Sequence, residues 1–216
     1  MSWLQGWRRA QASQRWIVLD VETTGLDVQR CRLLAIAAVA VRPGPRRIEV
    51  LPGDSFEVVL RGEDVALPVG GVVDKANILL HGIGVGQQRA GVDAATALRA
   101  FEEFTAGAPR LGFHVAFDRA VLERAARLSR IQVPRGRWAD LADLAPVLHP
   151  GTAARALDDW LALFGIECTQ RHQAACDALA TAELLQRLWP KVVAEDAADG
   201  FDALARLAAR RRWLAG

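Results

Sequence analysis

The sequence contains no apolar run that approaches the roughly 18 residues of a membrane-spanning helix. Its first residues also lack the apolar segment of a signal peptide, and it holds only three cysteines, Cys31, Cys168 and Cys176. That number is odd and the spacing is not that of a metal site, which argues against both a disulfide framework and a cysteine-bound metal. We therefore expect reduced thiols in a cytoplasmic protein with no membrane partner.

An excess of one charge is absent as well. The chain has 27 Lys and Arg against 25 Asp and Glu, for a formal net charge of +2. Proteins that coat nucleic acid regardless of sequence carry a broad basic field, which this balance excludes. The arginines gather near the two ends, at Arg8, Arg9, Arg206 and Arg210 to Arg212.

No internal repeat or low-complexity linker interrupts the 216 residues, of which 51% are hydrophobic. This length and composition are typical of one globular domain with small additions. We expect an N-terminal lead-in over residues 1–15, a main domain over 16–190, and a C-terminal helical extension over 191–216 that packs on the same domain.

The first part of the chain is predicted to form strands. Apolar runs bounded by turn residues, with Pro43-Gly44-Pro45 between two of them, indicate hairpin-linked antiparallel strands. The runs are Trp16–Val21, Leu33–Val41, and Ile48–Leu51 with Phe56–Leu60. Residues 61–91 are glycine-rich and predicted to be irregular, with one short helix around Lys75–Leu80.

The rest of the chain alternates between strand and helix. Short strands are predicted at Leu111–Phe113 and directly after the segment Pro134–Trp138. Helices are predicted from the cap Asp93 to Thr105, over Phe117–Leu128, Asp140–Leu148 and Ala154–Phe164 (ended by Gly165), and over Ala174–Trp189 (stopped by Pro190). Together these patterns predict an α/β fold with a mixed five-stranded sheet, three strands antiparallel and then two parallel, flanked by helices.

The first candidate site lies at the end of the first apolar run, where Asp20 and Glu22 precede a Thr-Thr-Gly turn. Strand side chains alternate, so these two carboxylates point the same way. Like charges side by side at a buried strand end repel unless a cation lies between them, and hard cations such as Mg²⁺ prefer oxygen ligands. The alternative is a strand whose acids alternate into solvent.

Two further acids begin predicted helices. Asp118 follows a buried strand, and Asp177 opens the long helix five positions after His172. Each acid has a plain alternative, since the helix dipole favours negative charge in a first turn, and His172 could be a surface loop histidine. On one helix, positions five apart diverge by about 140°, so His172 and Asp177 converge only if the histidine belongs to the preceding loop.

The order Asp-x-Glu, Asp, His-x4-Asp resembles the DEDDh 3′→5′ exonucleases, the family of the bacterial polymerase proofreading subunit and ribonuclease T. The three motifs read Asp20-Val21-Glu22-Thr23-Thr24-Gly25-Leu26, His114-Val115-Ala116-Phe117-Asp118 and His172-Gln173-Ala174-Ala175-Cys176-Asp177-Ala178. The resemblance covers about residues 16–189.

This resemblance implies an RNase H-like fold with the first acids on the central strand. It also implies two Mg²⁺ (or Mn²⁺) ions held by Asp20, Glu22, Asp118 and Asp177, with His172 as the general base. Four carboxylates carry a charge of −4, which two divalent cations balance. Two such cations suit an in-line phosphoryl displacement, and an imidazole accepts a proton near neutral pH. The implied products are nucleoside 5′-monophosphates.

A nucleotide pocket is implied as well. The resemblance assigns the backbone of Thr23 to the terminal 3′-OH, and Leu26 and Phe117 to the terminal base or sugar. Leu80, His81 and His114 complete the implied pocket, although His81 could equally be a solvated loop residue. The chain departs from the family at Phe113 and His114, where His and Asn are common, which puts substrate preference in doubt but not the metal ligands.

Two weaker signals remain. Gly82-x-Gly84-x-Gly86 lacks the strand and the Lys-Ser/Thr of a phosphate loop, so we interpret it as a flexible connection. The arginine-rich stretch Leu204–Trp213 could grip nucleic-acid phosphates, but we favour an amphipathic packing helix.

The leading hypothesis is a metal-dependent 3′→5′ exonuclease acting on single-stranded 3′ ends of DNA or RNA, with a DNA polymerase or a second copy of itself as a further partner. The alternative is a catalytically silent nucleic-acid- or polymerase-binding module of the same fold. Nothing in the sequence reads a 2′-OH, so DNA and RNA both remain open as substrates.

Overall fold

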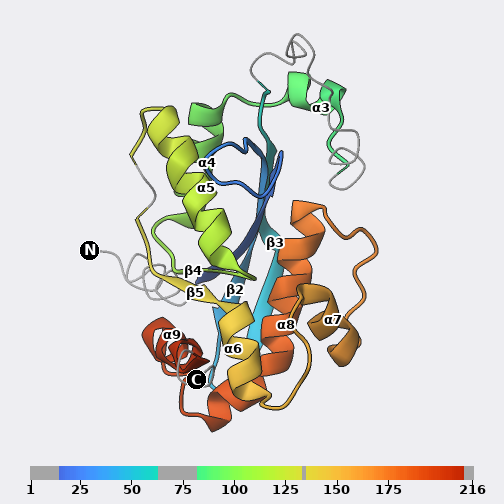
Figure 1. Ribbon diagram of the computed structural model, residues 1–216. Helices are drawn as coiled ribbons and strands as arrows, with labels where there is room; N and C mark the ends of the chain where they lie inside the picture. The colour runs from blue at the N-terminus through green and yellow to red at the C-terminus, as the bar shows by residue number, and fades with distance from the viewer. Residues whose placement is uncertain (1–14, 63–81, 133–134, 212–216) are drawn as a thin grey trace, which may run out of the picture.

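The computed structural model describes residues 15–62, 82–132 and 135–211, and Figure 1 shows a sheet held between helices. The strands are β1 (Trp16–Thr23), β2 (Leu33–Pro43), β3 (Ile48–Val59), β4 (Arg110–Gly112) and β5 (Trp138–Asp140). They form one five-stranded sheet in the order β3-β2-β1-β4-β5. The β1–β2 and β2–β3 pairs are antiparallel, whereas β1–β4 and β4–β5 are parallel. The predicted mixed sheet is confirmed, with β1 at its centre.

Helices cover both faces of this sheet (Figure 1). They are α3 (Val85–Ala90), α4 (Ala94–Thr105), α5 (Val115–Leu128), α6 (Leu141–Leu148), α7 (Leu157–Phe164), α8 (Ala174–Ala194) and α9 (Phe201–Ala209). Helices α4 and α5 pack on one face, and α6, α7, α8 and α9 pack on the other. None of the helices in the described ranges is long and apolar enough to cross a membrane.

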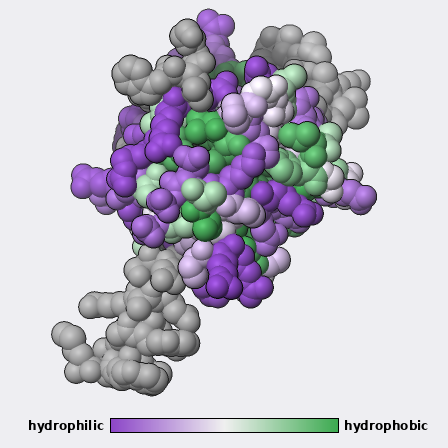
Figure 2. All heavy atoms as spheres, turned by 90° about the horizontal axis from the view of Figure 1, so that it is seen from below, coloured by the Kyte–Doolittle hydropathy of each residue, from purple (hydrophilic) through white to green (hydrophobic). Residues whose placement is uncertain are grey.

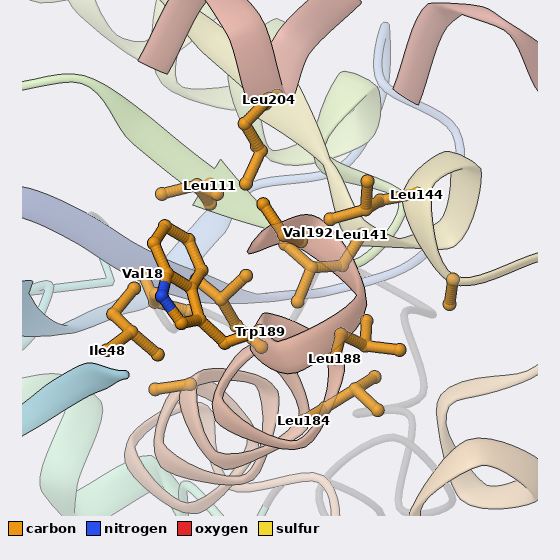
Figure 3. Close-up of a cluster of buried hydrophobic side chains, with 14 of the residues drawn as sticks. Val18, Ile48, Leu111, Leu141, Leu144, Leu184, Leu188, Trp189, Val192 and Leu204 are labelled. Atoms are coloured by element: carbon orange, nitrogen blue, oxygen red, sulfur yellow. The ribbon is translucent and has the colours of Figure 1, made fainter. Parts of the chain in front are cut away.

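The alternation of β1 divides the core in two. Trp16 and Val18 pack in the cluster that includes α8, whereas Ile17, Leu19 and Val21 pack in the cluster that includes α4 and α5. Figure 3 shows the first cluster, in which Trp189, Leu188 and Val192 of α8 lie against Val18, Leu111 and Leu141. Since both faces of β1 are buried, its position in the fold is set by apolar contacts on either side.

An arginine at the start of β4 ties this short strand to α4. Arg110 is fully buried, and its guanidinium donates to both carboxylate oxygens of Glu102 at 2.8 and 2.9 Å and to Thr105 Oγ1 at 2.9 Å. A buried charge is tolerated only when it is paired and hydrogen-bonded. The pair therefore anchors α4 beside β4, close to the turn that leads into α5.

Strand β3 is longer than predicted. The runs expected to be separate at Ile48–Leu51 and Phe56–Leu60 form one strand, because Pro52, Gly53 and Asp54 are accommodated in an irregularity of the β2–β3 register. Arg15 holds the irregular stretch through two hydrogen bonds of 2.7 Å to Asp54.

Helix α8 was predicted to stop at Pro190, and this was wrong, because the helix continues to Ala194. A proline inside a helix costs about 3 kcal/mol through its missing N–H and the clash of its ring. Val192 beyond it is fully buried, and Val193 also packs against the core. Burial of the apolar face of the last turn therefore outweighs the proline.

Two smaller corrections follow from local hydrogen bonds. Helix α7 begins at Leu157 and not at Ala154, because the Asp159 carboxylate accepts from the backbone N–H groups of Arg155 at 2.8 Å and Ala156 at 2.9 Å. The predicted flexible connection contains the short helix α3, whose first turn is closed by a 2.8 Å bond from Gly84 N to Gln87 Oε1. The helix predicted at Lys75–Leu80 lies outside the described residues.

Helix α9 belongs to the core. Phe201, Leu204 and Leu207 are buried in the α8-side cluster, and the ring of Phe201 meets that of Trp16 edge-on at 5.2 Å. Arg210 pairs with Glu195 at 2.9 Å and Arg211 with Asp143 at 3.4 Å. These contacts match the packing interpretation of this stretch.

Seen from below, the molecule is mainly hydrophilic with smaller apolar patches between polar side chains (Figure 2).

Candidate active site

Strand β1 presents two carboxylates on the side of α8. Asp20 and Glu22 continue the face of Trp16 and Val18, and both are half-buried. On β2 they lie opposite Ala37 and Ala35. The small methyl side chains of these neighbours leave the carboxylates free of bulky contacts on the sheet.

Asp177 faces them from the first turn of α8 and is only 6% exposed. One carboxylate oxygen of each of Asp20, Glu22 and Asp177 lies within 4.8 Å of the others. The structure thus brings together two predicted motifs that are more than 150 positions apart in the chain. Hereafter these three acids and Asp118 are called the acid cluster.

Asp118 joins the cluster from α5. Its Oδ1 accepts the backbone N–H of Val21 at 3.1 Å, across 97 positions of sequence, and the residue is 5% exposed. This bond fixes the start of α5 against the end of β1. Among the described residues, the group that satisfies the metal-ligand spacing holds Asp20, Glu22 and Asp177, so Asp118 lies outside this group.

The turn between β4 and α5 explains how Asp118 reaches β1. A Cβ at Gly112 would lie 2.9 Å from Val115 Cγ2 and 3.0 Å from Leu19 O, so only glycine allows this close approach. His114 then adopts a left-handed conformation (φ 59°) as the N-cap of α5, and its N–H donates to Asp140 Oδ1 at 2.9 Å. Asp140, which the sequence analysis did not single out, thereby holds the turn.

Three carboxyl groups of the acid cluster have pKa values above their usual range, chiefly because they are buried. Burial, assisted by the charges of Asp118 and Glu22, raises the pKa of Asp20 well above its usual value. Burial and the charge of Asp118 raise the pKa of Glu22 to about 7. Burial also raises the pKa of Asp118 to about 7, against the hydrogen bonds that its carboxylate accepts from backbone amides.

One cation does reach the cluster, and the sequence analysis missed it. Arg171 donates from Nη1 to Asp177 Oδ1 and from Nε to Asp158 Oδ1. Its charge lowers the pKa values of Asp20 and Glu22, in opposition to burial. The sequence did contain a signal, because a cluster of acids calls for a positive charge nearby and this arginine directly precedes His172 of the third motif.

His172 lies in the turn before α8, outside the helix, as convergence with Asp177 requires. It is exposed, its φ is 63°, and its backbone N–H donates to Asp177 Oδ2 at 3.2 Å. Within the part of the chain that the structure describes, its imidazole makes no hydrogen bond or ring contact. The ring is therefore accessible to solvent and to a substrate.

The predicted pocket residues lie in different surroundings. Thr23 is buried, and its hydroxyl donates to Gly25 O at 2.8 Å. Leu26 is 88% exposed, an unusual state for a large apolar side chain, whereas Phe117 is half-buried against the α4–α5 core. Leu80 and His81 lie outside the described residues.

His114 is exposed, and its ring packs edge-on against Phe113 with 4.9 Å between centroids. Together with Arg155, Trp160 and Arg211 it also lines a cavity of about 300 Å³. The two residues in which this chain departs from the family pattern therefore contact each other.

The donor set fits hard divalent cations. The acid cluster offers carboxylate oxygens, the ligand type that Mg²⁺ and Mn²⁺ prefer. Cys168 Sγ lies 3.8 Å from Asp177 Oδ1, as a hydrogen-bond donor. The raised pKa values of Asp20, Glu22 and Asp118 indicate that additional positive charge would be stabilising there.

Comparison with known proteins identifies similar sequences. The chain is 27% identical over 190 residues to the PolC-type DNA polymerase III of Latilactobacillus sakei, which covers 88% of this chain and 12% of that protein. The PolC-type polymerase of Bacillus subtilis is 28% identical over 181 residues, covering 83% of this chain and 12% of the polymerase. The chain therefore matches only a small part of the length of these relatives.

Solved structures with the same fold include two of E. coli exonuclease I. The complex with a dT13 oligonucleotide has a TM-score of 0.69 at 19% identity, over 83% of this chain and 42% of that chain. The zinc-bound complex with ssDNA has a TM-score of 0.66 at 22% identity, over 85% and 43% of the two chains. At this level of identity the likeness concerns the fold.

A profile of the exonuclease family RNase_T matches residues 17–185, which include β1, β4 and all three acidic motifs. The match spans most of the chain, and the mixed sheet with its flanking helices agrees with it. The chain belongs to the RNase_T exonuclease family, among the DnaQ-like 3′→5′ exonucleases of the RNase H-like superfamily.

Proposed function

We propose that this chain is a metal-dependent 3′→5′ exonuclease that removes nucleotides singly from the 3′ ends of single strands. The observation that carries the proposal is the convergence of Asp20, Glu22 and Asp177 within 4.8 Å, with Asp118 bonded to the backbone N–H of Val21, between the two acids of β1. A cluster of buried like charges is unfavourable for stability, and carboxyl groups with perturbed pKa values in such a cluster mark a candidate functional site.

Asp20, Glu22, Asp118 and Asp177 would hold two Mg²⁺ or Mn²⁺ ions. When bound, such a pair supplies positive charge to the two oxygens that exchange at phosphorus in an in-line displacement. The carboxylates orient the site and keep it rigid, because β1, α5 and α8 hold them from three directions.

His172 would accept a proton from the attacking water at a ring nitrogen. Its exposed position in the turn before α8 leaves the imidazole free to move toward the substrate. The water oxygen forms a bond to phosphorus as the bond from phosphorus to the 3′ oxygen breaks, and that oxygen leaves with a proton. The products are a nucleoside 5′-monophosphate and a strand shorter by one nucleotide.

Terminal nucleotide binding would use apolar and backbone contacts. Thr23 lies directly after the acids of β1, exposed Leu26 follows it, and Phe117 precedes Asp118. Leu80, His81 and His114 would complete this pocket. Apolar packing on bases tolerates any sequence, which suits a non-specific exonuclease.

Single-stranded DNA is the substrate we propose first. The two exonuclease I structures compared above are complexes with a dT13 oligonucleotide and with ssDNA, and the similar sequences are PolC-type DNA polymerases. A DNA polymerase is accordingly the partner that we propose for this chain.

The test is degradation of a 5′-labelled oligonucleotide by the purified chain. With Mg²⁺ or Mn²⁺ at pH 7–9, we expect a ladder that shortens stepwise from the 3′ end, and no shortening in EDTA. Asp20→Asn removes one carboxylate charge without changing side-chain size and should lower the rate by about 10³-fold or more, in line with the several kcal/mol that charge stabilisation supplies in such sites. Matched RNA and DNA strands in parallel establish the preferred substrate.

The same assay separates enzyme from binding module. If neither metal supports shortening of either nucleic acid while the strand still binds, the chain is the silent module and the proposal is wrong. Equal rates for Asp20→Asn and the unchanged chain would point to a contaminating nuclease.

A further inference from the structure

Arg171 connects the acid cluster to α7. Its side chain is 23% exposed, and it bridges Asp177, in the first turn of α8, and Asp158, in the first turn of α7. Asp177 is nearly buried, whereas the side chain of Asp158 is 62% exposed. The guanidinium therefore joins a buried carboxylate to a solvated one.

We propose that Arg171 is a built-in counter-ion of the acid cluster, which divalent cations displace from Asp177 when they bind. The inference rests on the proposed metal site. In this role, Arg171 sets the concentration of divalent cation at which the site fills.

The hydrogen bonds of Asp177 are the first argument. Its Oδ1 accepts from Arg171 Nη1, and its Oδ2 accepts from the backbone N–H of His172 at 3.2 Å. Both oxygens are thus satisfied within the protein. A cation that takes Asp177 as a ligand must compete with the guanidinium, because both positive groups seek the same carboxylate.

Electrostatics give the second argument. The charge of Arg171 acts on Asp20 and Glu22 as well as on Asp177. A positive charge at this place stabilises the metal-free cluster, which is otherwise buried and repulsive, and it disfavours the entry of further positive charge. Arg171 therefore raises the stability of the metal-free protein and lowers the affinity of the site for metal.

Asp158 has the role of an anchor. It lies outside the acid cluster, on the solvated first turn of α7, and holds Arg171 Nε while Nη1 contacts Asp177. This bond positions the guanidinium against Asp177, where it competes with an entering cation. Arg171 is therefore a positioning residue for the metal site and not a catalytic residue.

The experiment measures Mn²⁺ binding by titration calorimetry and the Tm of the full chain, with EDTA and with saturating Mn²⁺. For Arg171→Gln we expect a Kd for Mn²⁺ about tenfold lower, since a hydrogen bond to a charged group is typically worth about a decade in an equilibrium constant. In EDTA the Tm of this variant should fall below that of the unchanged chain, and saturating Mn²⁺ should remove most of the difference.

Further variants keep the result interpretable. Arg171→Lys retains the charge but loses the two-sided bridge, and should lie between the unchanged chain and Arg171→Gln. Asp158→Asn weakens only the anchor and should lower the Kd by a smaller factor. Arg42→Gln is the matched control, since Arg42 on β2 also forms an exposed pair, with Glu49 at 3.1 Å, and should leave the Kd unchanged.

The possible failures are distinct. If the unchanged chain binds Mn²⁺ and Arg171→Gln binds it no more tightly, the counter-ion role is wrong while the proposed function stands. An equal loss of Tm with and without Mn²⁺ would make Arg171 a structural bridge, which also overturns the role. If neither protein binds Mn²⁺, the metal site itself is wrong, and the proposed function fails with it.

Discussion

At the scale of single residues, His172 differs from the acids beside it because its side chain is held by nothing in the described structure. Its backbone is fixed by the left-handed turn and the bond to Asp177, but its ring is exposed. A group that must accept a proton needs access to water more than it needs a rigid partner. The exposed ring is accessible to water, as the proposed general base requires, and it makes no structural contact with the described residues.

We predict that His172→Ala lowers kcat by about 10²–10⁴-fold, the usual contribution of a general base, and leaves the Kd for Mn²⁺ nearly unchanged. Single-turnover assays at saturating metal measure the first quantity, and titration calorimetry measures the second. His149→Gln is the control, because His149 lies beside Lys191 at 3.3 Å, about 20 Å along α8 from Asp177. Equal losses of rate and of metal affinity would instead give His172 a structural role.

Residues were singled out from the sequence where a motif marks them. Asp20, Glu22 and Asp177 were singled out from their spacing, and the structure brings them together. Arg171 and Asp140 were missed, because their importance arises from the partners they meet across the fold, Asp177 for one and His114 for the other. The catalytic and metal-binding roles of Asp20, Glu22 and Asp177 stay predictions.

At the scale of secondary-structure elements, the turn between β4 and α5 decides where Asp118 lies. A Cβ added at Gly112 would lie 3.0 Å from Leu19 O, so the glycine lets β4 lie this close to β1. Helix α5 starts three residues later. A larger residue here must push β4 away from β1 or α5 away from Asp20. The stability of the fold and the geometry of the acid cluster are linked through this turn.

We predict that Gly112→Ala lowers the free energy of unfolding by about 1–3 kcal/mol, the usual cost of overpacking, and weakens Mn²⁺ binding. Urea denaturation and calorimetry measure the two effects. Gly53→Ala is the matched control, because nothing lies within 4 Å of a Cβ at that position and its φ is not in the left-handed region. If Gly112→Ala proves as stable as Gly53→Ala, the turn has more room than the structure indicates.

Element boundaries were predicted well where a cap is encoded locally. Asp93 caps α4 by accepting from Thr96 N at 3.0 Å, and Gly165 ends α7 with a φ of 60°. The end of α8 was wrong, because Pro190 is a local signal that the burial of Val192 overrides. Local chemistry predicts where a helix could end, whereas packing decides whether it does.

At the scale of the whole molecule, the acid cluster sets how stability depends on pH. The pKa values of Glu22 and Asp118 are raised to about 7 and that of Asp20 is raised as well, all chiefly by burial. In the unfolded chain these groups titrate near 4. Between these limits the native state binds more protons than the unfolded state, so the metal-free protein loses stability as pH rises.

We predict that the Tm in EDTA falls by at least about 3 °C from pH 5.5 to pH 7.5, which for a chain of this size corresponds to about 1 kcal/mol. Mn²⁺ should raise the Tm more at pH 7.5 than at pH 5.5, because metal ligands must be deprotonated. Differential scanning calorimetry measures both. Half-buried His149, whose pKa burial lowers, acts in the opposite direction, whereas Asp140, whose pKa burial raises, acts in the same direction as the three acids.

Asp20→Asn supplies the comparison for this pH dependence. It removes one of the raised carboxylates and part of the repulsion acting on Glu22 and Asp118, so its Tm in EDTA should vary less with pH. A Tm that rises from pH 5.5 to pH 7.5 in EDTA would show that other groups dominate the titration, contrary to this account.

The sequence by itself determined the class of fold and the available chemistry. Apolar periodicity and turn residues are local properties, and the ordered acidic motifs carry their family pattern without reference to distance. Only the tertiary structure decided that Arg171 reaches Asp177, that Gly112 lets α5 approach β1, and that α8 continues past Pro190. Each of these depends on contacts between elements far apart in the chain, whose free energy no local pattern encodes.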